Sequence, residues 1–513
     1  MLDDPLLVLQ AGDEAVRATL PQALAQLCAD DLTGFEGLAA HQRVPWLLFL
    51  CQVAAMALER ASRAQAAEDE DEWRGLADPG FWRAALLALT PGAEDTAWSL
   101  LVEDASRPAL LQPPVRRNLE RYGVIGATPD EIDLLVTAKA HDVKPARLDH
   151  AEPHHWLFAL VSLQTHQGYS GRGNFGIARM NGGFASRPML TLDAGQGWPS
   201  RFRRGVRVAL RARADALTTD TSLFIAGDLP LLWLEPWDEE IGLSPARLDP
   251  LFVEICRRVR LVRGPDGTIL ARGRPSECAR VAVPKELKGN LFDAWTPVGK
   301  DGAALTVGAG GFDYRLLFRI LCTDEFKRPA AMQALSSDPD EIWLHAAVLV
   351  RGQGKTEGLH ERWLRVPAFE DGASRESAAE IGAQMIVDAK NAKDALRLAL
   401  LTFLQGAPKR TELSDRSAET LLDAADQEID AVFFGHLFDR VSAGRDEATE
   451  WAWKKALLAI VRRIFDEGRR NLSPPESRRE RAHAIAGALF YARLAKAGLR
   501  QQPPGEPVVQ EAA

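Results

Sequence analysis

Residues 168–188 contain several glycines with arginines spaced among them, and this combination suits contact with a polyanion. Glycine allows positive φ and lets the backbone approach another molecule closely. Arginine adds a permanent charge and a planar donor fork that matches phosphate. The segment contains Gly168, Gly171, Gly173, Gly176, Gly182, Gly183, Arg172, Arg179 and Arg187. It therefore predicts a loop that lies against a polyanion, and a glycine-rich turn with surface arginines is the alternative.

Two glycine motifs superficially match nucleotide-binding fingerprints. The string GxGxxG at 171–176 needs a preceding strand within a βαβ unit, but the apolar run at 155–166 is at least as typical of a helix. The string GQGKT at 352–356 resembles the end of a P-loop, whose first glycine would have to replace Leu349. Neither motif predicts a nucleotide cofactor.

The remaining chemistry-bearing residues form no recognisable catalytic pattern. The clustered histidines match neither the HExxH motif nor a zinc-finger pair, so core or solvent-exposed histidines are the simpler interpretation. They are His141, His150, His154, His155 and His166. A metal-dependent nuclease that uses His141, Asp142 and His150 is kept as an alternative function. We otherwise expect no catalytic residues, no metal and no cofactor.

The five cysteines are scattered without CxxC spacing. This distribution argues against a disulfide framework or a cysteine zinc site. It fits a protein of a reducing compartment.

Two further basic segments are candidates for nucleic-acid contact. Residues 137–147 (TAKAHDVKPAR) form a basic loop that carries Lys139, His141 and Lys144. Residues 200–217 predict an arginine-rich helix, on which Arg204 and Arg207 share a face because of their spacing. We expect these two arginines to follow a nucleic-acid backbone, and a solvated helix face is the alternative.

The composition limits the class of protein. The chain has 513 residues, of which 46% are hydrophobic and 26% charged, as in an ordinary globular protein of several domains. The formal net charge is −9, so any nucleic-acid contact must be local. The acidic start (Asp3, Asp4) is unlike a signal peptide, and the longest apolar run, 44–58, is too short to span a bilayer. We expect a cytoplasmic protein that does not enter membranes.

The order of the expected elements predicts an α+β fold that ends in a helical domain. Expected helices before residue 350 cover 20–27, 35–63, 81–89, 129–136, 155–166, 200–217 and 312–321, and expected strands cover 2–9, 189–192, 260–262, 268–271, 303–307 and 343–350. From residue 374 onward, four apolar-striped helices predict an antiparallel bundle, over 375–405, 414–441, 446–470 and 478–498. We therefore expect a mixed α/β domain at 1–366 and a four-helix bundle at 367–513.

This order of features resembles the CasA family, the large subunit of the type I-E CRISPR surveillance complex Cascade. Residues 128–135 (TPDEIDLL), which begin with a capping box, resemble the family's threonine-proline helix. Residues 168–183 resemble its glycine loop, and residues 347–362 resemble a strand–loop–strand that reaches into duplex DNA. The chain departs from the family at Leu6 and Val8, where a tryptophan and a second proline are common, and it lacks the cysteine quartet of some members.

The resemblance implies a role in binding and no enzymatic activity. The family recognises the short protospacer-adjacent motif in double-stranded DNA, opens the duplex beside it so that an R-loop forms, and helps to recruit the helicase-nuclease. The implied partners are guide RNA, the other Cascade subunits, target DNA and that helicase-nuclease. A scaffold subunit of an unrelated complex is the alternative.

The resemblance also assigns candidate nucleic-acid contacts. The turn at 353–356 is placed as a wedge in the DNA, as minor-groove readers commonly use, with Lys355 closest to phosphates or base edges. Whether Gln353 or Thr356 enters the base stack stays open. The loop with Lys139, His141 and Lys144 resembles the one that contacts the guide RNA and neighbouring subunits. The expected contacts in the glycine loop are Gly171, Arg172, Gly173, Asn174, Gly176, Arg179, Asn181, Gly182 and Gly183.

Overall fold

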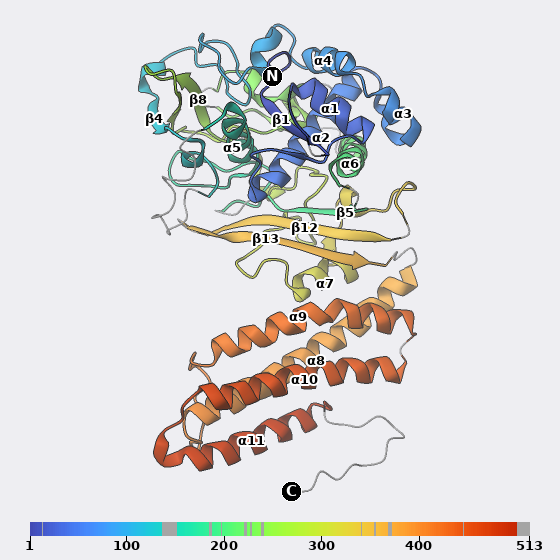
Figure 1. Cartoon of the computed structure of the whole chain (residues 1–513), viewed down its shortest axis with the longest axis vertical. Helices are drawn as coiled ribbons and strands as arrows, with labels where there is room; N and C mark the ends of the chain where they lie inside the picture. Colours follow the sequence, from blue (N-terminus) through green and yellow to red (C-terminus); the bar gives the residue numbers. More distant parts are fainter. Residues whose placement is uncertain are drawn as a thin grey trace. The chain divides into compact units, whose positions relative to one another are not determined.

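The chain folds into two compact units in the computed structural model (Figure 1). Unit 1 contains Met1–Phe312 and Glu325–Val366, and unit 2 contains Asp313–Asp324 and Pro367–Ala513. The structure describes residues 1–12, 14–135, 151–183, 187–195, 197–219, 223–225, 228–237, 241–339, 341–352, 355–367, 372–444 and 446–499. Small sheets with helices in unit 1 and a helical unit 2 confirm the expected α+β class.

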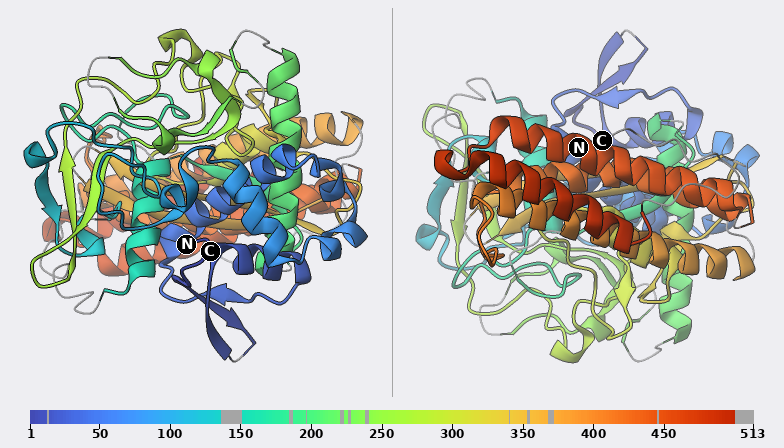
Figure 2. Two further views of the ribbon diagram at one scale, coloured as in Figure 1. Left: turned by 90° about the horizontal axis from the view of Figure 1, so that it is seen from above. Right: turned by 90° about the horizontal axis from the view of Figure 1, so that it is seen from below.

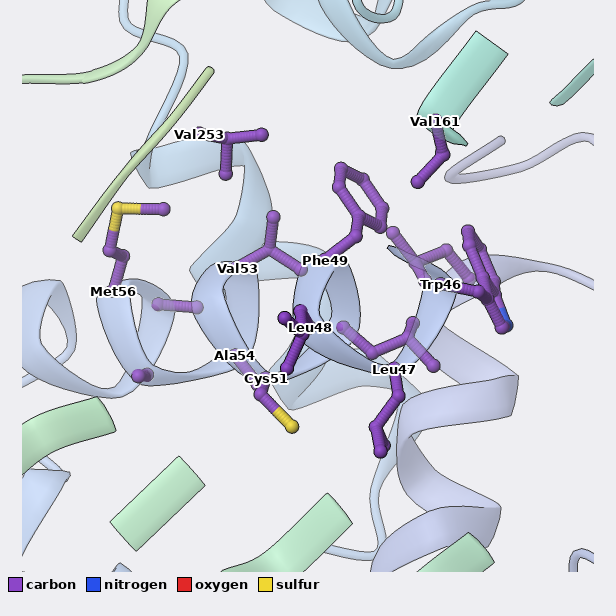
Figure 3. Close-up of a cluster of buried hydrophobic side chains, with 14 of the residues drawn as sticks. Trp46, Leu47, Leu48, Phe49, Cys51, Val53, Ala54, Met56, Val161 and Val253 are labelled. Atoms are coloured by element: carbon purple, nitrogen blue, oxygen red, sulfur yellow. The ribbon is translucent and has the colours of Figure 1, made fainter. Parts of the chain in front are cut away.

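Helix α2 (Arg43–Arg60) lies at the centre of the core of unit 1. Its sequence is apolar around the whole circumference, which is typical of a helix buried on all sides. Figure 3 shows Val161 of α5 (Pro153–His166) and Val253 of β7 (Leu248–Val253) on the side of α2 toward which Phe49 and Val53 point. Gln52 ties α2 to β7 by donating its amide to the carbonyl oxygens of residues 251 and 252. The buried glutamine is thereby satisfied, as buried polar groups require.

The described part of unit 1 also contains five small sheets. Their strand orders are β2-β1-β3, β10-β11, β13-β12-β5, β4-β9-β8 and β6-β7. The remaining strands are β1 (Leu7–Ala11), β2 (Glu14–Ala18), β3 (Gly34–Phe35), β4 (Gly123–Gly126), β5 (Met189–Asp193), β6 (Leu229–Leu231), β8 (Arg258–Arg263), β9 (Ile269–Arg274), β10 (Val298–Gly299), β11 (Phe326–Lys327), β12 (Ile342–Gly352) and β13 (Lys355–Val366). The remaining helices of unit 1 are α1 (Leu20–Ala29), α3 (Glu70–Gly75), α4 (Pro79–Ala88) and α6 (Gly197–Thr219).

The long hairpin of β12 and β13 is the largest strand pairing of unit 1. The two strands pair antiparallel from Ile342↔Val366 to Gly352↔Lys355, with one irregularity after Val350. Because β12 also pairs with β5, it is a central strand and nearly all of its residues are buried. This position explains its continuous apolar sequence and confirms the expected strand at 343–350.

Three expected elements differ from the structure. The helix expected from residue 35 begins at Arg43, because residues 34–35 pair with β1 as strand β3. The strand expected at 303–307 is reduced to an isolated bridge between Val298 and Ala304. The capping box at Thr128 starts only a single 3₁₀ turn, Pro129–Glu131, in the described part of that segment.

Unit 2 is built on helix α8 (Gly372–Leu404), which packs against three other long helices (Figure 2, right). These are α9 (Glu419–Ser442), α10 (Glu447–Asn471) and α11 (Arg479–Lys496). The short helix α7 (Tyr314–Cys322) joins them and packs the ring of Tyr314 4.8 Å from that of Phe433. Gly382 leaves room for α7, because a Cβ atom there would lie 2.2 Å from the Phe318 ring. Among the described helices of either unit, none combines the length and apolarity needed to cross a membrane.

Two of the clustered histidines are core residues of α5. His154 and His166 are both buried. Burial lowers the pKa of His154 to about 4 and that of His166 well below its usual value. This burial confirms the core interpretation for these two, whereas His141 and His150 lie outside the described residues. In the described residues, no group of three or more His, Cys, Asp or Glu side chains is arranged to hold a metal ion.

Acid should destabilise unit 1 through these histidines. Their folded pKa values lie below the unfolded value of about 6.5, so the unfolded state binds more protons and stability falls as the pH drops through about 6.5 toward 4. We expect the urea midpoint to fall over this window, and His154→Gln to flatten the fall. The slope above pH 7, where the histidines are neutral in both states, is the internal control. An equal slope in the wild type and the variant would contradict the prediction.

Candidate nucleic-acid interface

The glycine loop (residues 168–183) is closed at its base by backbone hydrogen bonds. The amide of Tyr169 donates to the carbonyl of Gly183 at 2.8 Å. A second tight turn forms at the tip, where the Asn174 amide donates to the Gly171 carbonyl at 3.0 Å. Helix α5 precedes the loop, so the strand that a dinucleotide fingerprint requires is absent there. The loop is therefore a compact Ω-type loop.

The glycines of this loop have different roles. Gly176 allows the chain to cross itself, because a Cβ atom there would lie 2.7 Å from the Tyr169 amide nitrogen. Gly173 lies against Pro275, whose Cβ would be 2.6 Å from an added Cβ. Gly182 and Gly183 have positive φ and open space in front of the Cβ position. The last two therefore present bare backbone to the outside.

Buried arginines hold the loop in place. Arg257 donates to the carbonyl oxygens of Gly168 and Phe175, and so clamps the first half of the loop. Arg179 is buried, donates to the Pro250 carbonyl at 2.9 Å and lies 3.7 Å above the Phe252 ring. It also pairs with the buried carboxylate of residue 254. Burial lowers the pKa of Arg179 to about 10, so this guanidinium stays charged at neutral pH. The burial of Arg179 contradicts the expectation that it contacts nucleic acid, because such a contact needs an exposed side chain.

An open hollow of about 500 Å³ borders the outer face of the loop. One wall consists of the bare backbone at Gly182 and Gly183, and the opposite wall carries Lys285 and Lys288. Lys285 is exposed and forms no ion pair with another described residue, whereas Lys288 pairs with Asp301 at 3.1 Å. The two walls touch at Gly289, where a Cβ atom would lie 2.1 Å from the backbone of Met180. The hollow combines exposed backbone with the positive charge of Lys285.

The predicted sites at 128–135 and 352–356 meet beside the glycine loop. The Thr356 hydroxyl of β13 donates to the Leu134 carbonyl at 3.3 Å. The charge of Arg351 on β12 interacts with Arg257, the clamp of the glycine loop, and with Asp133. Burial, with a smaller contribution from Arg257, lowers the pKa of Arg351 to about 10. Three segments that are far apart in sequence are therefore brought together.

Some predicted site residues are exposed and others fall outside the described residues. Arg172, Asn181, Gly182 and Gly183 are exposed, and Gly171, Gly173, Asn174 and Gly176 are half-buried. Gln353, Lys139, His141 and Lys144 lie outside the described residues, as does the side chain of Lys355. The backbone of Lys355 begins β13. The sequence reasoning missed Lys285 and Lys288, because single lysines in a loop carry no spacing signal and the hollow forms only when 284–289 packs on the glycine loop.

The arginine face of α6 is buried, which contradicts the exposure expected of Arg204 and Arg207. Arg204 pairs with Asp338 at 2.8 Å and donates to the Ala331 carbonyl at 2.9 Å. Arg207 donates to the Ser337 hydroxyl at 2.7 Å. The helix itself and the shared face are confirmed. The covering segment at 331–338 lies more than 100 residues away in sequence, so the spacing alone gave no sign of it.

A Cβ atom at Gly176 should open the glycine loop. We expect Gly176→Ala to lower the hydrogen-exchange protection of the Ile177 amide, which donates to the Gln167 carbonyl at 3.0 Å. Gly182→Ala is the matched control, since it meets no atom within 4 Å and only adds the left-handed cost of about 1–2 kcal/mol. Equal protection in both variants would show that the loop does not depend on the close approach at Gly176.

Arg204→Met should destabilise unit 1 strongly, because the carboxylate of Asp338 loses its partner in a buried ion pair. Removing one partner of such a pair costs about 3–5 kcal/mol. Arg211→Met, on the same helix but 42% exposed and paired with Glu68, should cost less than about 1 kcal/mol. The comparison is made by urea unfolding followed by tryptophan fluorescence. Similar losses for the two variants would contradict the buried role of Arg204.

Comparisons with known proteins agree on the fold. No family model matches the chain, and no curated protein matches it in sequence. CasA from Thermus thermophilus superposes with a TM-score of 0.61 at 16% identity, over 96% of this chain and 99% of that chain. Thermobifida fusca Cse1 gives 0.61 at 15% identity, over 98% of both chains.

A third structure adds an assembled complex to these matches. A chain of a CRISPR RNA-guided surveillance complex superposes with a TM-score of 0.59 at 15% identity, over 96% of this chain and 98% of that chain. The matches extend over nearly the whole length of each protein, which includes both units of the present chain. The resemblance seen in the sequence is thus confirmed in three dimensions, and the chain has the fold of the CasA (Cse1) proteins.

Proposed function

We propose that this chain is the large subunit of an RNA-guided CRISPR surveillance complex and belongs to the CasA family. In this proposal it recognises a protospacer-adjacent motif in duplex DNA, promotes opening of the duplex and R-loop formation, and helps to recruit the helicase-nuclease of its system. The observation that carries the proposal is the proximity of the glycine-loop clamp Arg257, the 128–135 segment and the facing ends of β12 and β13 within a chain of CasA fold.

The hollow beside the glycine loop is suited to the edge of a DNA groove. Bare backbone at Gly182 and Gly183 can approach base edges closely. The lysine at 285 on the opposite wall can neutralise a phosphate. In RNA-guided recognition the guide reads most of the sequence by base pairing, so the protein needs to read only a short motif. A small hollow with few specific side chains meets that need.

The β12–β13 turn is suited to separate the strands of the duplex. It is carried on a long, paired hairpin whose central strand is buried, so the turn can be pressed against a base step without bending its support. Thr356, near the start of β13, is held on the 128–135 segment by a hydrogen bond to the Leu134 carbonyl. Unstacking one step costs a few kcal/mol, which contacts on the two sides of the wedge can offset. A binding role of this kind needs no catalytic group.

Substitutions at the hollow and the turn should weaken binding of target DNA without affecting assembly. In the reconstituted complex with guide RNA, we expect Arg172→Ala, Lys285→Ala and Lys355→Ala each to raise the Kd for a motif-containing duplex about five- to tenfold. Each lost phosphate contact should also lower the salt slope by about 0.9. Gel shift measures affinity, and size exclusion measures assembly.

Lys327→Ala provides the matched control, since Lys327 is exposed on β11 and does not line the hollow. A duplex without the motif provides the second control, because it reports binding that does not depend on recognition. If all three variants bound the motif-containing duplex as tightly as the wild type does, the hollow and the turn would have no part in recognition.

A further inference from the structure

The sheet β4–β9–β8 carries arginines on one face next to an edge strand. Val124 of β4 stands opposite Arg272 of β9, which stands opposite Arg260 of β8. Directly opposite residues share a face of the sheet. The face is covered at β8, where Arg260 is buried and donates to carbonyl oxygens of residues 102–107. It is open at β4, where Val124 is 56% exposed.

Four arginines in this sheet or in the segment that leads into β4 form no ion pair with another described residue. Arg116, Arg117 and Arg121 precede β4 and are exposed, and Arg272 is half-buried. None of the four pairs with another side chain in the part of the chain that the structure describes, and the buried Nε of Arg272 has no hydrogen-bond partner there. We call these four residues the arginine edge. Such unpaired guanidiniums suit an external polyanion.

The carboxylates nearest in sequence form no ion pair with the arginine edge in the described residues. Glu120 lies between Arg117 and Arg121 in sequence, and Glu277 follows β9. Asp104 interacts with Arg260 on the covered side of the sheet. Because the whole chain has a net charge of −9, a local excess of positive charge is what permits a polyanion to approach at this place.

The arginine edge continues into the glycine loop. β9 ends at residue 274, and the next residue, Pro275, lies against Gly173 of the loop. The Ser276 amide donates to the Gly173 carbonyl at 2.8 Å. Arg172, exposed on the same turn, therefore extends the positive charge from the sheet to the loop. In Figure 1, β4 and β8 lie on the side of unit 1 at which β12 ends and β13 begins.

We propose that the arginine edge binds the phosphate backbone of the duplex that continues outward from the hollow. This inference rests on the proposed function, because it takes the hollow as the place where the motif is read. The exposed Val124 and Ile125 could also suit a protein subunit, but the uncompensated charge and the continuity with the hollow favour DNA.

The test compares duplex targets that differ only in the length of the flank beyond the motif. The reconstituted complex with guide RNA is titrated with labelled duplexes that carry about 5 or about 25 flanking base pairs, from about 50 to about 200 mM salt. The variant is Arg121→Gln with Arg272→Gln. The matched control is Arg263→Gln, an exposed arginine at the end of β8.

We expect the wild type and the control to bind the long flank about tenfold more tightly than the short one, and the variant to lose this gain. Its salt slope on the long flank should fall by about 1.8, for two lost phosphate contacts. Its affinity for the short flank should stay unchanged. Arg116→Gln with Arg121→Gln, two exposed positions, repeats the test without touching the sheet.

Three outcomes would overturn the inference. If the variant gains as much from the long flank as the wild type does, the arginine edge does not hold DNA. If the variant chain is missing from the complex in size exclusion, the edge is a docking surface for a protein subunit. If the wild type binds the short duplex equally with and without the motif, the proposed function itself fails. In the first two outcomes, the wild type still binds the short duplex in a motif-dependent way.

Discussion

Buried guanidinium groups satisfy the backbone carbonyls of the irregular segments of unit 1, and the placement of the loops depends on them. Arg257 holds the glycine loop, Arg260 holds residues 102–107, and Arg280 donates to carbonyls of residues 232–236. A buried carbonyl without a donor costs about 1–3 kcal/mol. Burial lowers the pKa of Arg260 and Arg280 to about 10, so both remain charged at neutral pH and keep all of their donors. Each of these arginines thus donates hydrogen bonds to several loop carbonyls that are not paired within a sheet.

This use of arginine explains which parts of the molecule could be predicted from the sequence. Helices such as α2, α5 and α6 were predicted, because their apolar periodicity is local. The β12–β13 hairpin was predicted from resemblance together with an apolar run. The exposure of Arg179 and Arg204 was predicted wrongly, because the sequence does not show whether an arginine side chain is exposed to water or hydrogen-bonded to a buried carbonyl. Its partners lie far away along the chain, and only the folded structure brings them near.

The candidate site was predicted in the same uneven way. The glycine loop was recognised from its composition, and its exposed residues Gly182, Gly183 and Arg172 are still candidates. The hollow could not be predicted, since it depends on the contact between Gly289 and Met180. The arginine edge also escaped notice, since Arg121 and Arg272 come from segments that are far apart in sequence. Which arginines are left without partners is decided only by folding, so the sequence alone did not show them.

The placement of α7 has a consequence for how the chain is synthesised. Helix α7 belongs to unit 2 although residues of unit 1 precede and follow it in the chain. Its aromatic partner Phe433 leaves the ribosome more than 100 residues after Tyr314, which at about 5–20 residues per second is a wait of at least several seconds. Until then the contact between these two rings cannot form, although α8, which also packs on α7, is made sooner. Unit 2 thus takes up a helix that is made before the last two strands of unit 1, and a chain interrupted after unit 1 would carry a helix whose packing partners were never made.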